Sequence, residues 1–115
     1  MANLLNVLKI LAALGTIATG LFSLLKPLSV RAFTGLEVAG PRGITEIRAV
    51  LGGFFVALGA APLIFGTTGM FLMLGLAYCG VAAVRAFSMV FDKSLMRSNY
   101  ISLATEVILG IILIV

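Results

Sequence analysis

The chain has 115 residues, of which 62% are apolar and only 10% are charged. Water-soluble domains are usually about 45–50% apolar and about 25% charged, and a chain of this length could not bury such an excess of apolar surface. We therefore expect an integral membrane protein, with one domain over residues 1–115 and lipid as the solvent for much of it.

The net charge of +4 does not indicate a nucleic-acid partner, because the basic residues are scattered over predicted loops and helix ends. The chain has no histidine, so it lacks the commonest metal and haem ligand, and we expect no metal and no cofactor. No Ser-His, Cys-His or phosphate-binding arrangement supports catalysis, and we expect no enzyme. A single cysteine, Cys79, excludes an internal disulfide and is expected to be a small packing residue.

The first apolar segment predicts a membrane helix over residues 4–25. Its start is not a basic leader, and no small-residue cleavage site follows, so we expect it to be retained. Ala12, Thr16 and Gly20 recur every four residues and form a stripe where another helix can come close. Pro27 is expected to end this helix.

The second helix is expected over residues 45–65, after a mixed surface segment over 26–43 that has room for a short helical turn. Small residues at a spacing of four predict its packing face: Ala49, Gly53, Ala57 and Ala61. Pro62 falls in its last turns, where it is expected to kink or end the helix.

A tight turn over 66–69 leads to a third helix over residues 70–91. A charged loop then leads to a fourth helix over residues 99–115, which Ser98 or Asn99 is expected to cap. The predicted fold is an all-α membrane protein with four transmembrane helices in an up-down antiparallel bundle.

Four charged residues lie within the predicted helices, where an unpaired charge is expensive in lipid: Glu46, Arg48, Arg85 and Glu106. An up-down path brings all four to the same half of the bundle, with Arg85 about 9 Å and Glu106 about 10 Å in from their helix ends. The predicted pairing joins Glu106 to Arg85 or Arg48, and Glu46 to whichever remains. Polar side chains near enough to support this network are Tyr78, Ser88, Asn99 and Ser102.

The loop charges predict an orientation. The side with both charged loops carries Lys26, Arg31, Arg42, Lys93 and Arg97, whereas the other side has only Lys9. The positive-inside rule then predicts cytoplasmic charged loops and both termini outside, in a bacterial-type inner membrane.

The stretch Glu46-Ile47-Arg48-Ala49, followed by Gly52-Gly53 and Ala57-Leu58-Gly59, resembles the signature of a family of small bacterial four-helix membrane proteins. That family is catalogued only as a domain of unknown function. Arg85 matches an arginine late in its third helix, and Glu106 with Gly110 matches a glutamate and glycine in its fourth. The resemblance implies the four-helix topology and no activity. The small multidrug transporters are similar in size only, because their pattern centres on a glutamate in the first helix.

Three kinds of function follow from these features. We favour a non-enzymatic structural or accessory subunit, either a homo-oligomer or part of a larger membrane complex, held by the Glu/Arg network. The alternative is a small proton- or solute-coupled carrier that uses Glu106 and Arg85. A membrane enzyme or pigment-binding protein has the least support, because no catalytic arrangement or histidine ligand is present.

Overall fold

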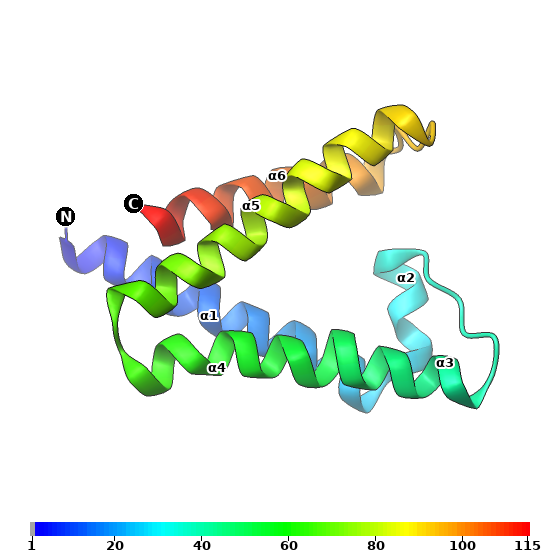
Figure 1. Cartoon of the computed structure of the whole chain (residues 1–115), viewed down its shortest axis with the longest axis horizontal. Coiled ribbons are helices and arrows are strands. Elements are labelled where there is room, and N and C mark those ends of the chain that lie inside the picture. Colours follow the sequence, from blue (N-terminus) through cyan, green and yellow to red (C-terminus); the bar gives the residue numbers. More distant parts are fainter. Residues whose placement is uncertain (1) are drawn as a thin grey trace. The chain divides into compact units, whose positions relative to one another are not determined.

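The computed structural model describes residues 2–115, and no residue in that range forms a β-strand. Four helices in it are long and apolar enough to cross a membrane: Asn3–Leu25, Pro41–Phe65, Thr68–Phe91 and Arg97–Ile114 (Figure 1). This confirms the predicted fold class of an all-α membrane protein with four spanning helices. The chain divides into two compact units, one over Ile10–Phe65 and one that joins Gly66–Val115 to the start of the chain as far as Lys9. The single domain expected over residues 1–115 stays a prediction.

The first helix, α1 (Ala2–Leu25), ends two residues before Pro27, as predicted. Its Thr16, Thr19 and Ser23 hydroxyls donate to backbone carbonyls one turn earlier, at 2.9, 3.0 and 3.0 Å. Side chains that bond back to their own helix satisfy their polar groups locally. These hydroxyls therefore leave the helix apolar enough for a membrane.

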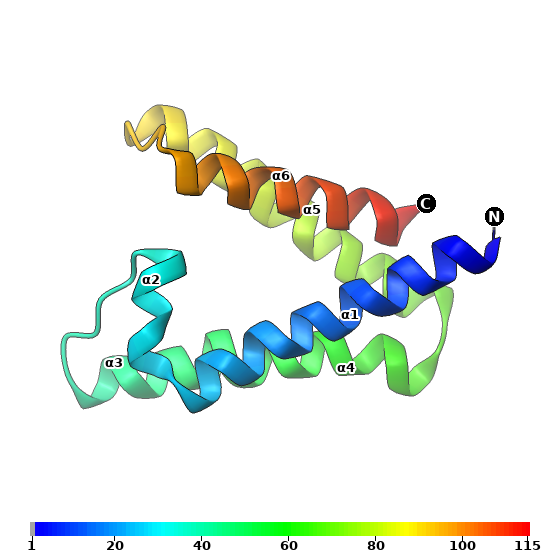
Figure 2. The ribbon, with the colours of Figure 1, turned by 180° about the vertical axis from the view of Figure 1, so that it is seen from behind.

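The segment after α1 contains the expected short helical turn. It consists of a 3₁₀ turn, η1 (Pro27–Val30), and one turn of helix, α2 (Arg31–Thr34), before an extended stretch (Figure 2). Phe33 packs its ring 5.5 Å from that of Phe22 on α1, which anchors this segment.

The second spanning helix is built from three consecutive pieces: α3 (Pro41–Glu46), a π-helical segment η2 (Ile47–Phe54) and α4 (Phe55–Phe65). It starts four residues earlier than predicted, because proline is well suited to the first position of a helix. Pro62 lies three residues before the end of this helix at Phe65, which is the end predicted from the sequence. Membrane helices tolerate proline when local adjustments satisfy the freed backbone groups.

Within the unit Ile10–Phe65, α1 runs antiparallel to η2 and α4 and approaches them closely. A Cβ atom on Gly20 would lie 2.7 Å from the carbonyl oxygen of Gly52, and one on Gly59 would lie 2.6 Å from that of Ala13. Thr16, between these two crossings, is buried. The predicted packing stripe on the first helix is therefore confirmed.

The packing face predicted for the second helix is wrong. Ala49, Gly53 and Ala57 are exposed, whereas Ile47 and Gly52 are buried. The hydrogen bonds of a π-helix span five residues, the interval between Ile47 and Gly52. The face that meets α1 carries Gly52 and Gly59, which lie two turns apart, and it is a different face of the helix from the alanine stripe.

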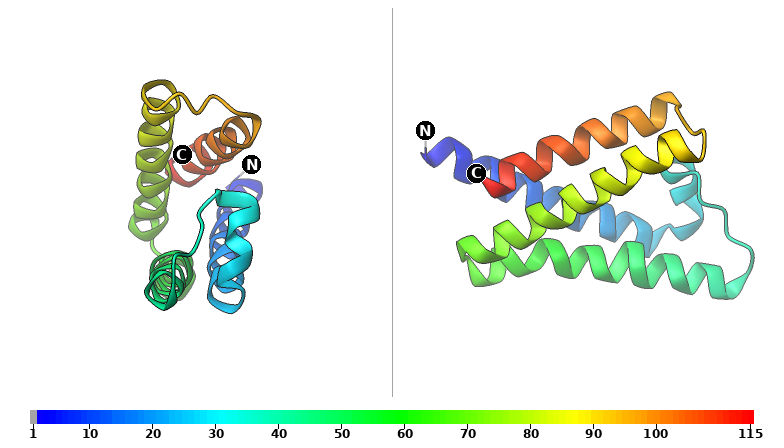
Figure 3. Two further views of the ribbon diagram at one scale, coloured as in Figure 1. Left: turned by 90° about the vertical axis from the view of Figure 1, so that its right-hand side faces the viewer. Right: turned by 45° about the horizontal axis from the view of Figure 1, so that its top comes forward.

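In the unit Gly66–Val115, α5 (Thr68–Phe91) and α6 (Arg97–Ile114) form an antiparallel hairpin (Figure 3). The predicted turn before α5 is confirmed: Gly66 has a left-handed φ of 65°, and the Thr67 side chain accepts a hydrogen bond from the Met70 N–H. A Cβ on Gly110 would lie 2.7 Å from the sulfur of Cys79. Cys79 therefore acts as a packing residue against α6, as predicted.

Candidate functional site

The most developed polar site lies between the two helices of this hairpin. Arg85 projects from α5 and Glu106 from α6, and the two side chains are joined by two parallel hydrogen bonds. Arg85 Nε donates to Glu106 Oε1 at 2.8 Å, and Nη2 donates to Oε2 at 2.8 Å. This bidentate arrangement is among the stronger kinds of ion pair, because planar guanidinium and carboxylate groups match in geometry. It is one of the two pairings predicted for Glu106.

Asn99 completes the site at its loop end. Its Oδ1 accepts a hydrogen bond from Arg85 Nη1 at 3.0 Å, and its Nδ2 donates to the Ser94 carbonyl at 2.9 Å. The expectation that Ser98 or Asn99 caps α6 is wrong, because that helix starts earlier and has Met96 at its N-cap, without a side-chain cap. Asn99 instead ties Arg85 to the loop between the helices.

The two charged side chains differ in burial. The side chain of Glu106 is 12% exposed and that of Arg85 is 30% exposed. Both oxygens of the more buried group, the carboxylate, accept a hydrogen bond from Arg85. The open side of the site thus presents the cation.

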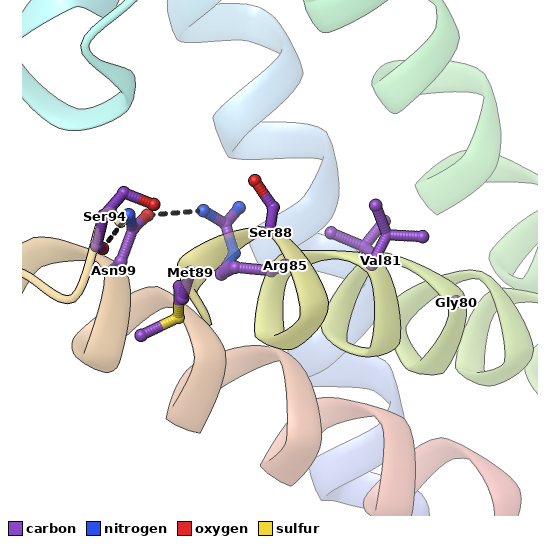
Figure 4. Close-up of a pocket in the computed structure, with 8 residues that line it drawn as sticks. Gly80, Val81, Arg85, Ser88, Met89, Ser94 and Asn99 are labelled. Atoms are coloured by element: carbon purple, nitrogen blue, oxygen red, sulfur yellow. Dashed lines mark hydrogen bonds between the residues drawn. The ribbon is translucent and has the colours of Figure 1, made fainter. Parts of the chain in front are cut away.

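A groove of about 570 Å³ lies on this open side (Figure 4). Its polar lining comes from Arg85, Ser88, Ser94 and Asn99. Its apolar lining comes from Gly80, Val81 and Val84 in the turns of α5 before Arg85, and from Met89 one turn after it. The polar groups of the groove therefore lie towards the loop, and its part towards the middle of the helix is apolar.

The other two predicted network charges lie in the unit Ile10–Phe65, near the start of its second spanning helix. Glu46 Oε1 lies 3.9 Å from Arg42 Nε, and both side chains are largely exposed. Arg48 is also exposed. Arg42 is the partner that sequence reasoning missed, because it was assigned to the loop. Its position four residues before Glu46 is the signal that could have identified it. The convergence of all four charges stays a prediction.

The polar residues predicted to support the network also differ in what they contact. Asn99 contacts Arg85, but the Ser88 hydroxyl donates to Asp92 at 2.6 Å. Tyr78 and Ser102 are both half-buried, two turns before Arg85 and one turn before Glu106. Asn99 is thus the supporting residue whose hydrogen bond reaches the ion pair.

No family model, curated protein or solved structure matches this chain. The family resemblance stays a prediction, and the function is inferred from the geometry of the site. Within residues 2–115, no group of three or more His, Cys, Asp or Glu side chains could hold a metal ion. Glu106 is engaged by Arg85 through both oxygens, so the site's chemistry is that of a fixed ion pair beside a cationic groove.

Proposed function

We propose that the protein is a small integral membrane protein with a non-enzymatic, structural or accessory role. The observation that carries the proposal is that both carboxylate oxygens of Glu106 accept hydrogen bonds from one guanidinium group. An acid that relays protons has to gain and lose a proton during its cycle. Glu106 could do so only by giving up a bidentate pair with a side chain that stays charged. The geometry therefore supports a pair that holds two helices together.

In a membrane, the hydrogen bonds of this pair help to hold α5 against α6. Lipid tails are as apolar as leucine side chains, so helices in lipid associate through close packing and interhelical hydrogen bonds. Gly75 and Gly110 allow α5 and α6 to approach closely, and Arg85 with Glu106 fixes one helix against the other. Sliding or rotating either helix would separate the two charged groups.

We further propose that the chain works in an assembly, as a homo-oligomer or as a subunit of a larger membrane complex. The connections between the spans are residues 26–40, 66–67 and 92–96, none of them long enough for a separate domain. Large apolar side chains are exposed on the hairpin, including the stacked rings of Phe87 and Phe91. With so little chain outside the membrane, any accessory role would be performed through these intramembrane surfaces. Sizing the species purified in mild detergent tests this, and a strictly monomeric particle without a partner would contradict it.

The alternative is a proton- or solute-coupled carrier, and the groove beside Arg85 is the observation that favours it. The two functions differ in what Glu106→Gln should do. The structural role predicts a lower thermal unfolding temperature and no proton flux above that of empty liposomes, before or after the substitution. Glu37→Gln is the control, because the pair of Glu37 with Arg31 is exposed and should contribute less than about 1 kcal/mol. Proton flux that Glu106→Gln abolishes, with the unfolding temperature unchanged, would establish the carrier instead.

We also propose that the charged loops face the cytoplasm of a bacterial-type inner membrane, with both termini outside. Five of the six basic residues near helix ends or in loops belong to the two charged loops, which supports this orientation. In a Cys79→Ala background, Ser94→Cys should resist a membrane-impermeant thiol reagent added to intact cells, whereas Thr67→Cys should react. Labelling of Ser94→Cys but not Thr67→Cys would reverse the orientation.

A further inference from the structure

The groove beside Arg85 offers more hydrogen-bond donors than the ion pair uses. A guanidinium group has five N–H bonds. Three of those on Arg85 are used, two by Glu106 and one by Asn99, which leaves two. Asn99 has one further amide N–H, and the Ser94 hydroxyl also lines the groove. Both oxygens of the Glu106 carboxylate, which pairs with this guanidinium, already accept bonds from it. The polar end of the groove is therefore complementary to an anion.

The charges around this end sum to a net positive value. Arg85 and Glu106 cancel, and Asp92 and Lys93 in the connection together with Arg97 at the start of α6 add up to +1. Asp92 is the acidic group closest to the groove lining, and it accepts the Ser88 hydroxyl. A net positive loop at a membrane surface attracts anionic headgroups, at about 1 kcal/mol per basic residue.

The depth of the groove fits a lipid. Arg85 lies seven residues before Asp92, which is about 10 Å along the helix. The polar layer on each side of a bilayer is about 5–8 Å thick. With Asp92 placed at its outer edge and α5 upright, Arg85 falls near the base of this layer and Gly80, about 8 Å farther in, falls among the acyl chains. The polar and apolar parts of the groove thus follow the headgroup and chain of a phospholipid.

We propose that this groove binds one anionic phospholipid, with its phosphate against Arg85, Asn99 and Ser94 and an acyl chain along Val84, Val81 and Gly80. This goes beyond the structural role, because it assigns a ligand to the cationic face that the ion pair leaves open. The site requires the pair, since Glu106 and Asn99 hold the guanidinium in place. Binding can nevertheless be removed without touching any of these three side chains.

Gly80 provides the sharpest test. A Cβ placed there meets no atom within 4 Å, so a side chain can leave the helix freely at this position, with a gain in helix propensity. Gly80→Leu would place its side chain in the groove that Gly80 lines. Gly69→Leu is the matched control on the same helix, because Gly69 is equally open and lies outside the groove. Thermal unfolding of the two variants checks that both are folded.

The experiment is native mass spectrometry in mild detergent, after exposure to an equimolar mixture of phosphatidylglycerol and phosphatidylcholine with the same chains. The original protein and Gly69→Leu should retain phosphatidylglycerol about fivefold more than phosphatidylcholine, a preference that falls with salt. Gly80→Leu should lose that preference. Equal retention of the two lipids by the original protein, or an unchanged preference in folded Gly80→Leu, would overturn the proposal.

A second measurement does not depend on the folding of Gly80→Leu. Val84 lines the groove and is 69% exposed, so a photo-crosslinking amino acid at this position should capture phosphatidylglycerol in vesicles that contain it. Capture of a second copy of the chain, without lipid, would show that the groove is a protein interface and overturn the lipid assignment.

Discussion

Arg85→Leu is expected to lower the free energy of unfolding of the α5–α6 hairpin by about 3 kcal/mol. The substitution leaves the Glu106 carboxylate, whose side chain is 12% exposed, without either of its hydrogen-bond donors. It also removes the donor to Asn99. A lone buried carboxylate costs far more than a paired one. Thermal unfolding in mild detergent, followed by circular dichroism, measures the loss.

Arg31→Leu is the matched control for this variant. Arg31 also pairs with a glutamate, Glu37, at 3.0 Å, but the two side chains are 69% and 66% exposed. Water screens such a pair, so its loss should cost less than about 1 kcal/mol. Equal stability losses for Arg85→Leu and Arg31→Leu would show that burial gives the Arg85 pair no special role.

Gly20→Ala is expected to separate α1 from the helix it packs against and to cost about 2–3 kcal/mol. The added methyl carbon would lie 2.7 Å from the Gly52 carbonyl oxygen and 2.7 Å from the Val56 backbone nitrogen. Backbone atoms cannot rotate away as a side chain can, so the helices themselves must move. Thermal unfolding in the same detergent measures the effect.

Gly15→Ala is the control on the same helix. A Cβ at Gly15 meets no atom within 4 Å, so this change should stabilise α1 by up to about 1 kcal/mol through helix propensity alone. The two glycine variants should therefore move the unfolding temperature in opposite directions. Stabilisation by both would contradict the close approach of Gly20 to Gly52.

The apolar segments and their breaks were enough to predict the four spans. Long apolar runs with few charges define membrane helices, Pro27 follows the end of the first, and the Gly66-Thr67 turn separates the second from the third. The pairing of Arg85 with Glu106 was one of two that the sequence predicted for this glutamate. A short connection makes α5 and α6 neighbours, and an arginine in lipid needs a carboxylate.

Local backbone geometry was harder to predict. No residue pattern indicates that Ile47–Phe54 adopts a π-helix. Small residues occur on more than one face of this helix, and the prediction chose the alanine stripe instead of the face with Gly52 and Gly59. The early helix start at Pro41 likewise put Arg42 one turn before Glu46, where it forms an exposed pair. Both errors arise where the choice between helix faces or the position of a helix boundary, rather than hydrophobicity, decides which side chains meet.

The central claim is that Arg85 and Glu106 act as one structural unit, and a double-mutant cycle tests it most directly. The four proteins are the original, Arg85→Leu, Glu106→Leu and the variant with both changes, compared by their free energies of unfolding in one detergent. Because either single change strands the other charge, the double variant should be more stable than the sum of the single losses predicts, with a coupling of about 2 kcal/mol. Additive losses, with a coupling below about 0.5 kcal/mol, would contradict the account.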